Sequence, residues 1–214
     1  LSVGLAYFLA HQLAFLFPDS AGLLVAVWPA GGIGLAALLL SPRPVWPAML
    51  SVMFVTGAVA NLLSGRPGFA SLGFIVANVL ESAACAWLIT RLCGPRITFR
   101  NVNEILALIL AAIVINADTA LIGAGTAALS AGLPFWSFYK NWWIADGLGL
   151  LLLTPLLVFW RQQSVPWSAW SGKRRLELGA LAGISCVGVW LVFGVNHTRL
   201  PIIPHPYMLC LVLL

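Results

Sequence analysis

The chain has 214 residues, of which 61% are hydrophobic and only 8% are charged, and its formal net charge is +5. Its mean hydropathy of +1.00 excludes a soluble globular domain, because a soluble domain of this size needs a polar exterior. The apolar runs are long and continuous, which favours transmembrane helices of about 20 residues over the short alternating strands of a β-barrel. The sequence therefore predicts an all-α integral membrane protein.

Eight spans are predicted in chain order, at about residues 1–17, 21–40, 45–64, 69–92, 102–129, 134–160, 176–195 and from 205 onward. The connecting loops are short, so neighbouring helices are expected to pack antiparallel in one bundle. The eighth span is cut off at residue 214. We therefore expect residues 1–214 to form a single membrane domain within a longer protein.

Three places in the spans predict a break or a bend. The sequence "WPAGG" at residues 28–32 places Pro29, which lacks a backbone N–H, directly before two glycines. Pro155 lies within "LLTPLL" of the sixth span, and predicts a second break. The long fifth run is expected to break before its end, because it contains Gly123 and Gly125.

The basic residues predict the orientation of the spans. One set of loops contains Arg43, Arg91, Arg96, Arg100, Arg161, Lys173, Arg174 and Arg175, whereas the other set contains only Arg66 and Arg199. Cytoplasmic loops are enriched in Lys and Arg, so the first set is predicted to be cytoplasmic. Both ends of the chain are then expected on the cytoplasmic side.

Four ionisable side chains lie well inside predicted spans: Glu81, Asp118, Lys140 and Asp146. Each costs at least about 2.5 kcal/mol near the middle of a bilayer, so such residues usually face the interior of a bundle and pair there. Asn78 lies three residues before Glu81 and shares its helix face. Asn116 and Asp118 are two apart, so only one of them can point to the interior.

The sixth span, "YKNWWIADGLGLLLLTPLLVF", adds two tryptophans to this set. Trp142 shares a helix face with Asp146, and Trp143 shares one with Lys140. A polar pocket that binds a ligand or moves protons is one interpretation, and a polar network that only fixes helix packing is the other. The candidate pocket residues are Trp28, Pro29, Asn78, Glu81, Asp118, Lys140, Trp142, Trp143 and Asp146.

Motifs of catalysis and metal binding are not found in the sequence. The chain has no nucleophile elbow, no phosphate-binding glycine loop and no HExxH motif, and its four cysteines and three histidines lack metal-ligand spacing. We therefore predict neither catalytic residues, nor a metal, nor a cofactor. The basic loop "RQQSVPWSAWSGKRR" at residues 161–175 is typical of a segment at lipid headgroups rather than a nucleic-acid site.

Four segments together resemble a known family. They are "WPAGGIGLAALLL", "RPVWPAMLSVMFVTGAVANLL", "ANVLESAACAWLITRL" and "WWIADGLGLLLLTPLLVFW", and in this order they resemble the membrane-associated sensor domain of the first type, in the MASE family. One departure is "WPAGG", where many relatives read WPPAG. The resemblance implies a domain of about eight helices at the N-terminus of bacterial histidine kinases and diguanylate cyclases.

The resemblance implies a sensory input domain in the bacterial inner membrane, with a kinase or cyclase output domain beyond residue 214. The expected partners are the lipid bilayer, an unidentified small-molecule or membrane signal, the output domain and a second copy of the chain, and no nucleic acid. An ion-coupled carrier is the alternative, because broken helices and central carboxylates also fit one. A scaffold that only holds partners in the membrane is a third interpretation.

Overall fold

The computed structural model describes residues 2–14, 27–66 and 68–162, and short pieces between residues 171 and 183. Contacts divide the chain into two compact units, Leu1–Gln162 and Gln163–Leu214. The helices of the first unit are α1 (Ser2–Ala14), α2 (Pro29–Leu39), the 3-10 helix η1 (Arg43–Val45), α3 (Trp46–Leu63), α4 (Gly68–Cys93), α5 (Val102–Ala131) and α6 (Phe135–Arg161).

The all-helical membrane class is confirmed in the described residues, but eight spans are not shown. Four segments are long and apolar enough to cross a membrane: η1 with α3, then α4, α5 and α6. Their ends fall within one or two residues of the predicted spans at 45–64, 69–92, 102–129 and 134–160. The spans predicted at 176–195 and from 205 onward lie almost entirely outside the described residues.

The helix α2 covers only the later part of the span predicted at 21–40, of which residues 21–26 lie outside the described residues. It begins at Pro29, and the preceding residue, Trp28, has non-helical backbone angles (φ −104°, ψ 88°). Proline suits the first position of a helix, because its missing N–H would have no partner within the helix there. The 11 residues of α2 span about 16 Å, roughly half of a hydrocarbon core of about 30 Å.

At the other two predicted positions the helices are not interrupted, so the prediction of a break was wrong there. The helix α5 runs without interruption past Gly123 and Gly125 and ends at Gly132, which has a left-handed φ of 64°. A Cβ on Gly123 would come within 2.8 Å of the ring of Trp142, so this glycine permits close helix packing instead of a break. The helix α6 likewise continues through Pro155, because losing one backbone hydrogen bond does not end a well-packed helix.

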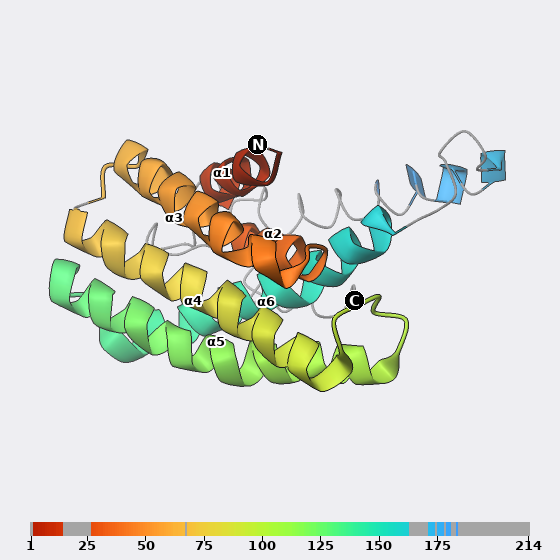
Figure 1. The fold of residues 1–214 in the computed structure, drawn as a ribbon. Coiled ribbons are helices and arrows are strands. Elements are labelled where there is room, and N and C mark those ends of the chain that lie inside the picture. The colour runs from red at the N-terminus through yellow and green to blue at the C-terminus, as the bar shows by residue number, and fades with distance from the viewer. Residues whose placement is uncertain are drawn as a thin grey trace, which may run out of the picture. The chain divides into compact units, whose positions relative to one another are not determined.

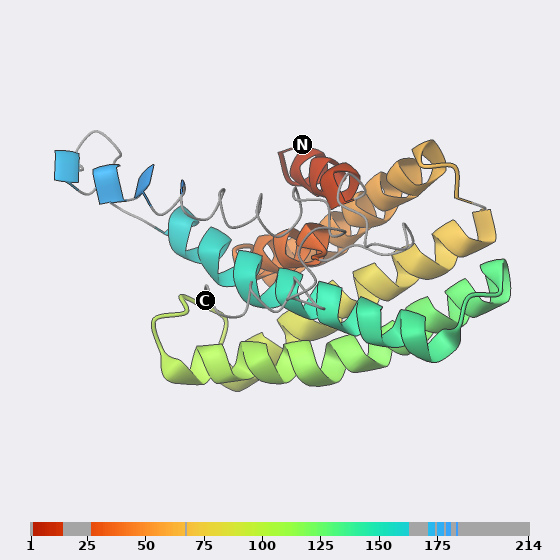
Figure 2. The same cartoon turned by 180° about the vertical axis from the view of Figure 1, so that it is seen from behind.

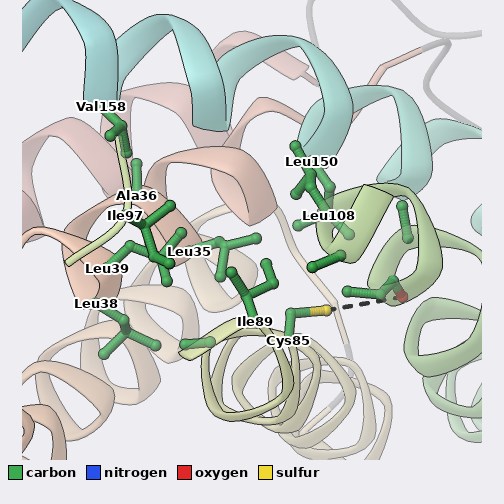
Figure 3. Packing of buried hydrophobic residues seen from close by; sticks show 14 residues of the cluster. Leu35, Ala36, Leu38, Leu39, Cys85, Ile89, Ile97, Leu108, Leu150 and Val158 are labelled. Carbon is green, nitrogen blue, oxygen red and sulfur yellow. Dashed lines mark hydrogen bonds between the residues drawn. The ribbon is translucent and has the colours of Figure 1, made fainter. Parts of the chain in front are cut away.

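The half-length helix α2 has a central place in this unit. It contacts α1, α3, α4 and α6, while α4 packs between α3 and α5, as Figures 1 and 2 show. Figure 3 shows the apolar core that surrounds α2. In this core Leu35 and Leu39 of α2 meet Ile89 of α4, Leu108 of α5 and Leu150 of α6.

The basic residues of the two predicted sets of loops lie at different ends of the unit, as far as the structure describes them. Arg43 donates to the Thr90 hydroxyl at 2.9 Å, and the guanidinium of Arg100 lies 5.9 Å from the ring centre of Phe159. The last turns of α4 and α6 and the start of α3 therefore lie at the same end of the unit. At the other end Arg66 donates to Asn61 at 3.2 Å, and burial lowers the pKa of Arg66 to about 10.

Candidate functional site

The buried start of α2 is fixed against α6. The N–H of Trp28 donates to the carbonyl oxygen of Ala145 at 2.9 Å, and the hydroxyl of Thr154 donates to the carbonyl of Gly32 at 3.3 Å. The backbones of α2 and α6 touch here, because a Cβ on Gly149 would overlap the carbonyl group of Trp28. The glycines of "WPAGG" and of "DGLG" thus let two backbones approach within the apolar part of the protein.

Two carboxyl groups meet beside this contact. Glu81 of α4 is 0% exposed and Asp146 of α6 is 3% exposed, and their side chains lie close enough to interact with each other. A Cβ on Gly31 would lie 3.3 Å from Oε2 of Glu81, so the first turn of α2 borders the pair. The N-terminal end of a helix carries a partial positive charge, which favours a negative group at this point.

Hydrogen-bond donors to the pair are scarce in the described part of the chain. The side chain of Trp142, one turn before Asp146, interacts with the Asp146 carboxyl group. Both oxygens of Glu81, and Oδ2 of Asp146, are buried and have no donor among the described residues. Asn78, one turn before Glu81 on the same face, adds a buried Oδ1 in the same condition.

Aromatic side chains from α1 and from the residue before α2 form another part of the site. Tyr7 is 1% exposed and lies within electrostatic range of both Glu81 and Asp146. His11, one turn further along α1, packs edge-on against Trp28 with ring centres 4.6 Å apart. The site therefore combines residues from α1, the start of α2, α4 and α6.

The helix α5 does not contribute to the carboxyl pair itself, but it holds the part of α6 that carries Asp146. Asn116 is fully buried, and its side-chain amide donates to the carbonyl oxygen of Trp143 at 2.7 Å. The indole N–H of Trp143 donates to the carbonyl of Ile113 at 3.2 Å. Trp142 packs against Gly123 of α5 and lies 5.4 Å from the ring centre of Phe74 in α4. These contacts hold the Trp142–Asp146 segment of α6 in position.

The structure brings together six of the nine residues proposed for the pocket. Trp28, Asn78, Glu81, Trp142 and Asp146 lie at or beside the pair, and Pro29 is half-buried at the first position of α2. Trp143 faces α5 instead. Asp118 and Lys140 are exposed on the helix surface and do not join the pair.

Sequence reasoning missed three buried polar residues near the site. They are Tyr7, His11 and Ser82, whose exposed fractions are at most 1%. A usable signal existed for Ser82, because Asn78, Glu81 and Ser82 follow the i, i+3, i+4 spacing of one helix face. Tyr7 and His11 share a face of α1 by the same spacing, but no sequence signal indicated which helix that face meets.

Within the described residues no group of three or more His, Cys, Asp or Glu side chains gathers as a metal site would require. The arrangement is that of a multi-helix membrane protein whose centre holds a close carboxyl pair at the start of a half-length helix. Over residues 1–214 the chain matches MASE1, so it belongs to this family of membrane sensory domains. No curated protein and no solved structure shows a significant match to it.

Proposed function

We propose that this chain is the sensory input domain of a multi-pass bacterial inner-membrane signalling protein, and that its signal acts through the Glu81–Asp146 pair. The single observation that carries this proposal is the position of the pair. It lies where the buried start of α2 is bonded to α6, so a change in the charge of the pair acts directly on a contact between two helices.

The signal has an effect only if it favours one arrangement of α2 and α6 over another. A shift from 1:99 to 99:1 between two arrangements requires about 5.5 kcal/mol of differential binding. Creating or cancelling a charge inside a low-dielectric site is an interaction large enough for such a shift. The change is then passed along α6 towards a cytoplasmic output domain, which the family resemblance suggests is a histidine kinase or a diguanylate cyclase.

The test measures output activity per folded molecule in the full-length protein. Glu81→Gln and Asp146→Asn keep the side-chain shape and remove the charge, and Asp118→Asn removes an exposed membrane carboxylate as the matched control. We expect the first two variants to fold and to hold the basal output at one extreme, while the control behaves as the parent protein does. Parent-like output from both variants, at parent-like folded amounts, contradicts the proposal.

An ion-coupled carrier is the second candidate, and the half-length helix favours it. Carriers place their ion sites at interrupted helices near the membrane midplane, where helix ends face the ion. Purified protein in sealed liposomes distinguishes the two candidates under an imposed pH or Na⁺ gradient. A sensor leaves the gradient in place, whereas sustained flux that Glu81→Gln abolishes establishes the carrier.

A further inference from the structure

Among the described residues, most of the buried oxygens of the carboxyl pair have no hydrogen-bond donor. Oε1 and Oε2 of Glu81, Oδ2 of Asp146 and Oδ1 of Asn78 are all buried and without a donor among the described residues. Each belongs to a side chain that is no more than 3% exposed. A buried acceptor without a partner is costly, and two adjacent carboxylates cannot both stay ionised without a compensating positive charge.

The elements packed around the pair supply no such charge from their described residues. From α1 the ionisable group that interacts with the pair is Tyr7, whereas His11 packs against Trp28. The helices α2 and α3 contain no ionisable side chain. Cys85 lies one turn further along α4. The ionisable side chain facing the pair from α6 is Asp146 itself.

The charged residues elsewhere in the described helices and loops do not reach the pair. Lys140 and Asp118 are exposed, and Arg66 acts electrostatically on His11. Glu104 lies in the first turn of α5, where its Oε2 accepts from the N–H of Thr98. The partial positive charge at the start of α2 is present beside Glu81, but it is less than one full charge.

We infer that the Glu81–Asp146 pair is the binding site of a single small monovalent cation, either a proton shared between the two carboxyl groups or a Na⁺ ion held between them. Both supply the positive charge that the described residues around the site do not provide. Asn78, on the same face of α4, contributes a neutral oxygen to the Na⁺ form. Four oxygens are too few for Ca²⁺, which takes six to eight oxygen ligands.

The inference deepens the proposed function, and it rests on that function only for its consequence: occupancy by the cation is the signal state. An occupied site has one negative charge fewer than an empty one, directly beside the bonded α2–α6 contact. Loss of the cation would leave two carboxylates in repulsion between α4 and α6, which drives these helices apart.

The experiment uses the full-length protein in lipid nanodiscs, with infrared spectroscopy of the carboxyl groups at neutral pH. In Na⁺-free choline chloride we expect a protonated-carboxyl C=O band that shifts in Glu81→Gln and in Asp146→Asn, is lost in the double variant, and is unchanged in Asp118→Asn. Titration with NaCl then separates the two cations. A band that Na⁺ removes, with a saturable change in tryptophan fluorescence, identifies a Na⁺ site, whereas a band indifferent to Na⁺ identifies a proton site.

Two results overturn the inference. The first is the absence of a protonated-carboxyl band and of any Na⁺-dependent change in the parent protein, which needs no variant to fold. The second is a band that persists unchanged in the variant that carries both Glu81→Gln and Asp146→Asn. Binding of a cation that leaves the output unchanged supports the inference and contradicts the proposed sensory role. If Glu81→Gln alters the output but the parent protein binds no cation, the result supports the proposed sensory role and contradicts the inference.

Discussion

The N–H of Trp28 donates to the carbonyl oxygen of Ala145 at 2.9 Å, and this bond ties the start of α2 to α6 one residue before Asp146. The non-helical backbone at Trp28 is buried, and buried backbone groups need partners. A break inside a membrane protein is tolerated because another helix supplies that partner. The same contact places the first turn of α2 beside Glu81.

Gly149→Ala is expected to destabilise the protein, because its Cβ would overlap the carbonyl group of Trp28 and neither backbone can easily move. Overpacking of this kind costs about 1–3 kcal/mol. The matched control is Gly125→Ala in α5, where a Cβ meets nothing within 4 Å. Thermal unfolding in detergent should show a clearly lower midpoint for Gly149→Ala. Equal midpoints for the two variants would mean that the close α2–α6 contact is absent.

Glu104→Gln is expected to loosen the loop between α4 and α5. Oε2 of Glu104 accepts from the N–H of Thr98 at 2.8 Å and from the N–H of Phe99, whose left-handed φ of 55° this anchoring helps to hold. Hydrogen bonds to a charged group contribute about 1.5–3 kcal/mol, and the neutral amide weakens them. Unfolding in a denaturing detergent checks this, with Asp118→Asn as the control. A loss no greater than that of the control refutes the anchoring role.

The orientation is tested with single cysteines in a background where the four native cysteines are replaced by alanine. A cysteine at exposed Ser64, beside Arg66, should react with an impermeant thiol reagent in intact cells, and one at exposed Pro95 should not. The reason is the basic cluster of Arg43, Arg96, Arg100 and Arg161 at the Pro95 end. The reverse labelling pattern would overturn the predicted orientation.

Hydropathy and helix period predicted the long helices and the interior positions of Glu81 and Asp146, because both signals are local. The partners of α1 were not predictable, since the contact of His11 with Trp28 depends on how separate helices pack. Periodicity required either Asn116 or Asp118 to face outward but did not say which. The structure buries Asn116 and exposes Asp118.

The glycines of α5 show another limit of sequence reasoning. Gly123 and Gly125 both predicted a break, yet only the packing explains Gly123, which accommodates the ring of Trp142. A glycine that bends a helix and one that admits a neighbour have the same local signature. The helix α2 shows the converse case, because Pro29 marks a change of backbone that the sequence predicted, and the helix beyond it ends at Leu39, one residue before the end of the predicted span.

The pairing of Glu81 with Asp146 is the central claim, and solid-state NMR of the protein in lipid tests it most directly. With carbon-13 in the Asp and Glu side chains, a through-space cross-peak should join the carboxyl carbons of the two residues, assigned by its loss in Glu81→Gln and in Asp146→Asn. We predict this cross-peak, and none between Glu81 and Asp118. Its absence in folded protein, with both carboxyl signals resolved, would contradict the pairing and the site built on it.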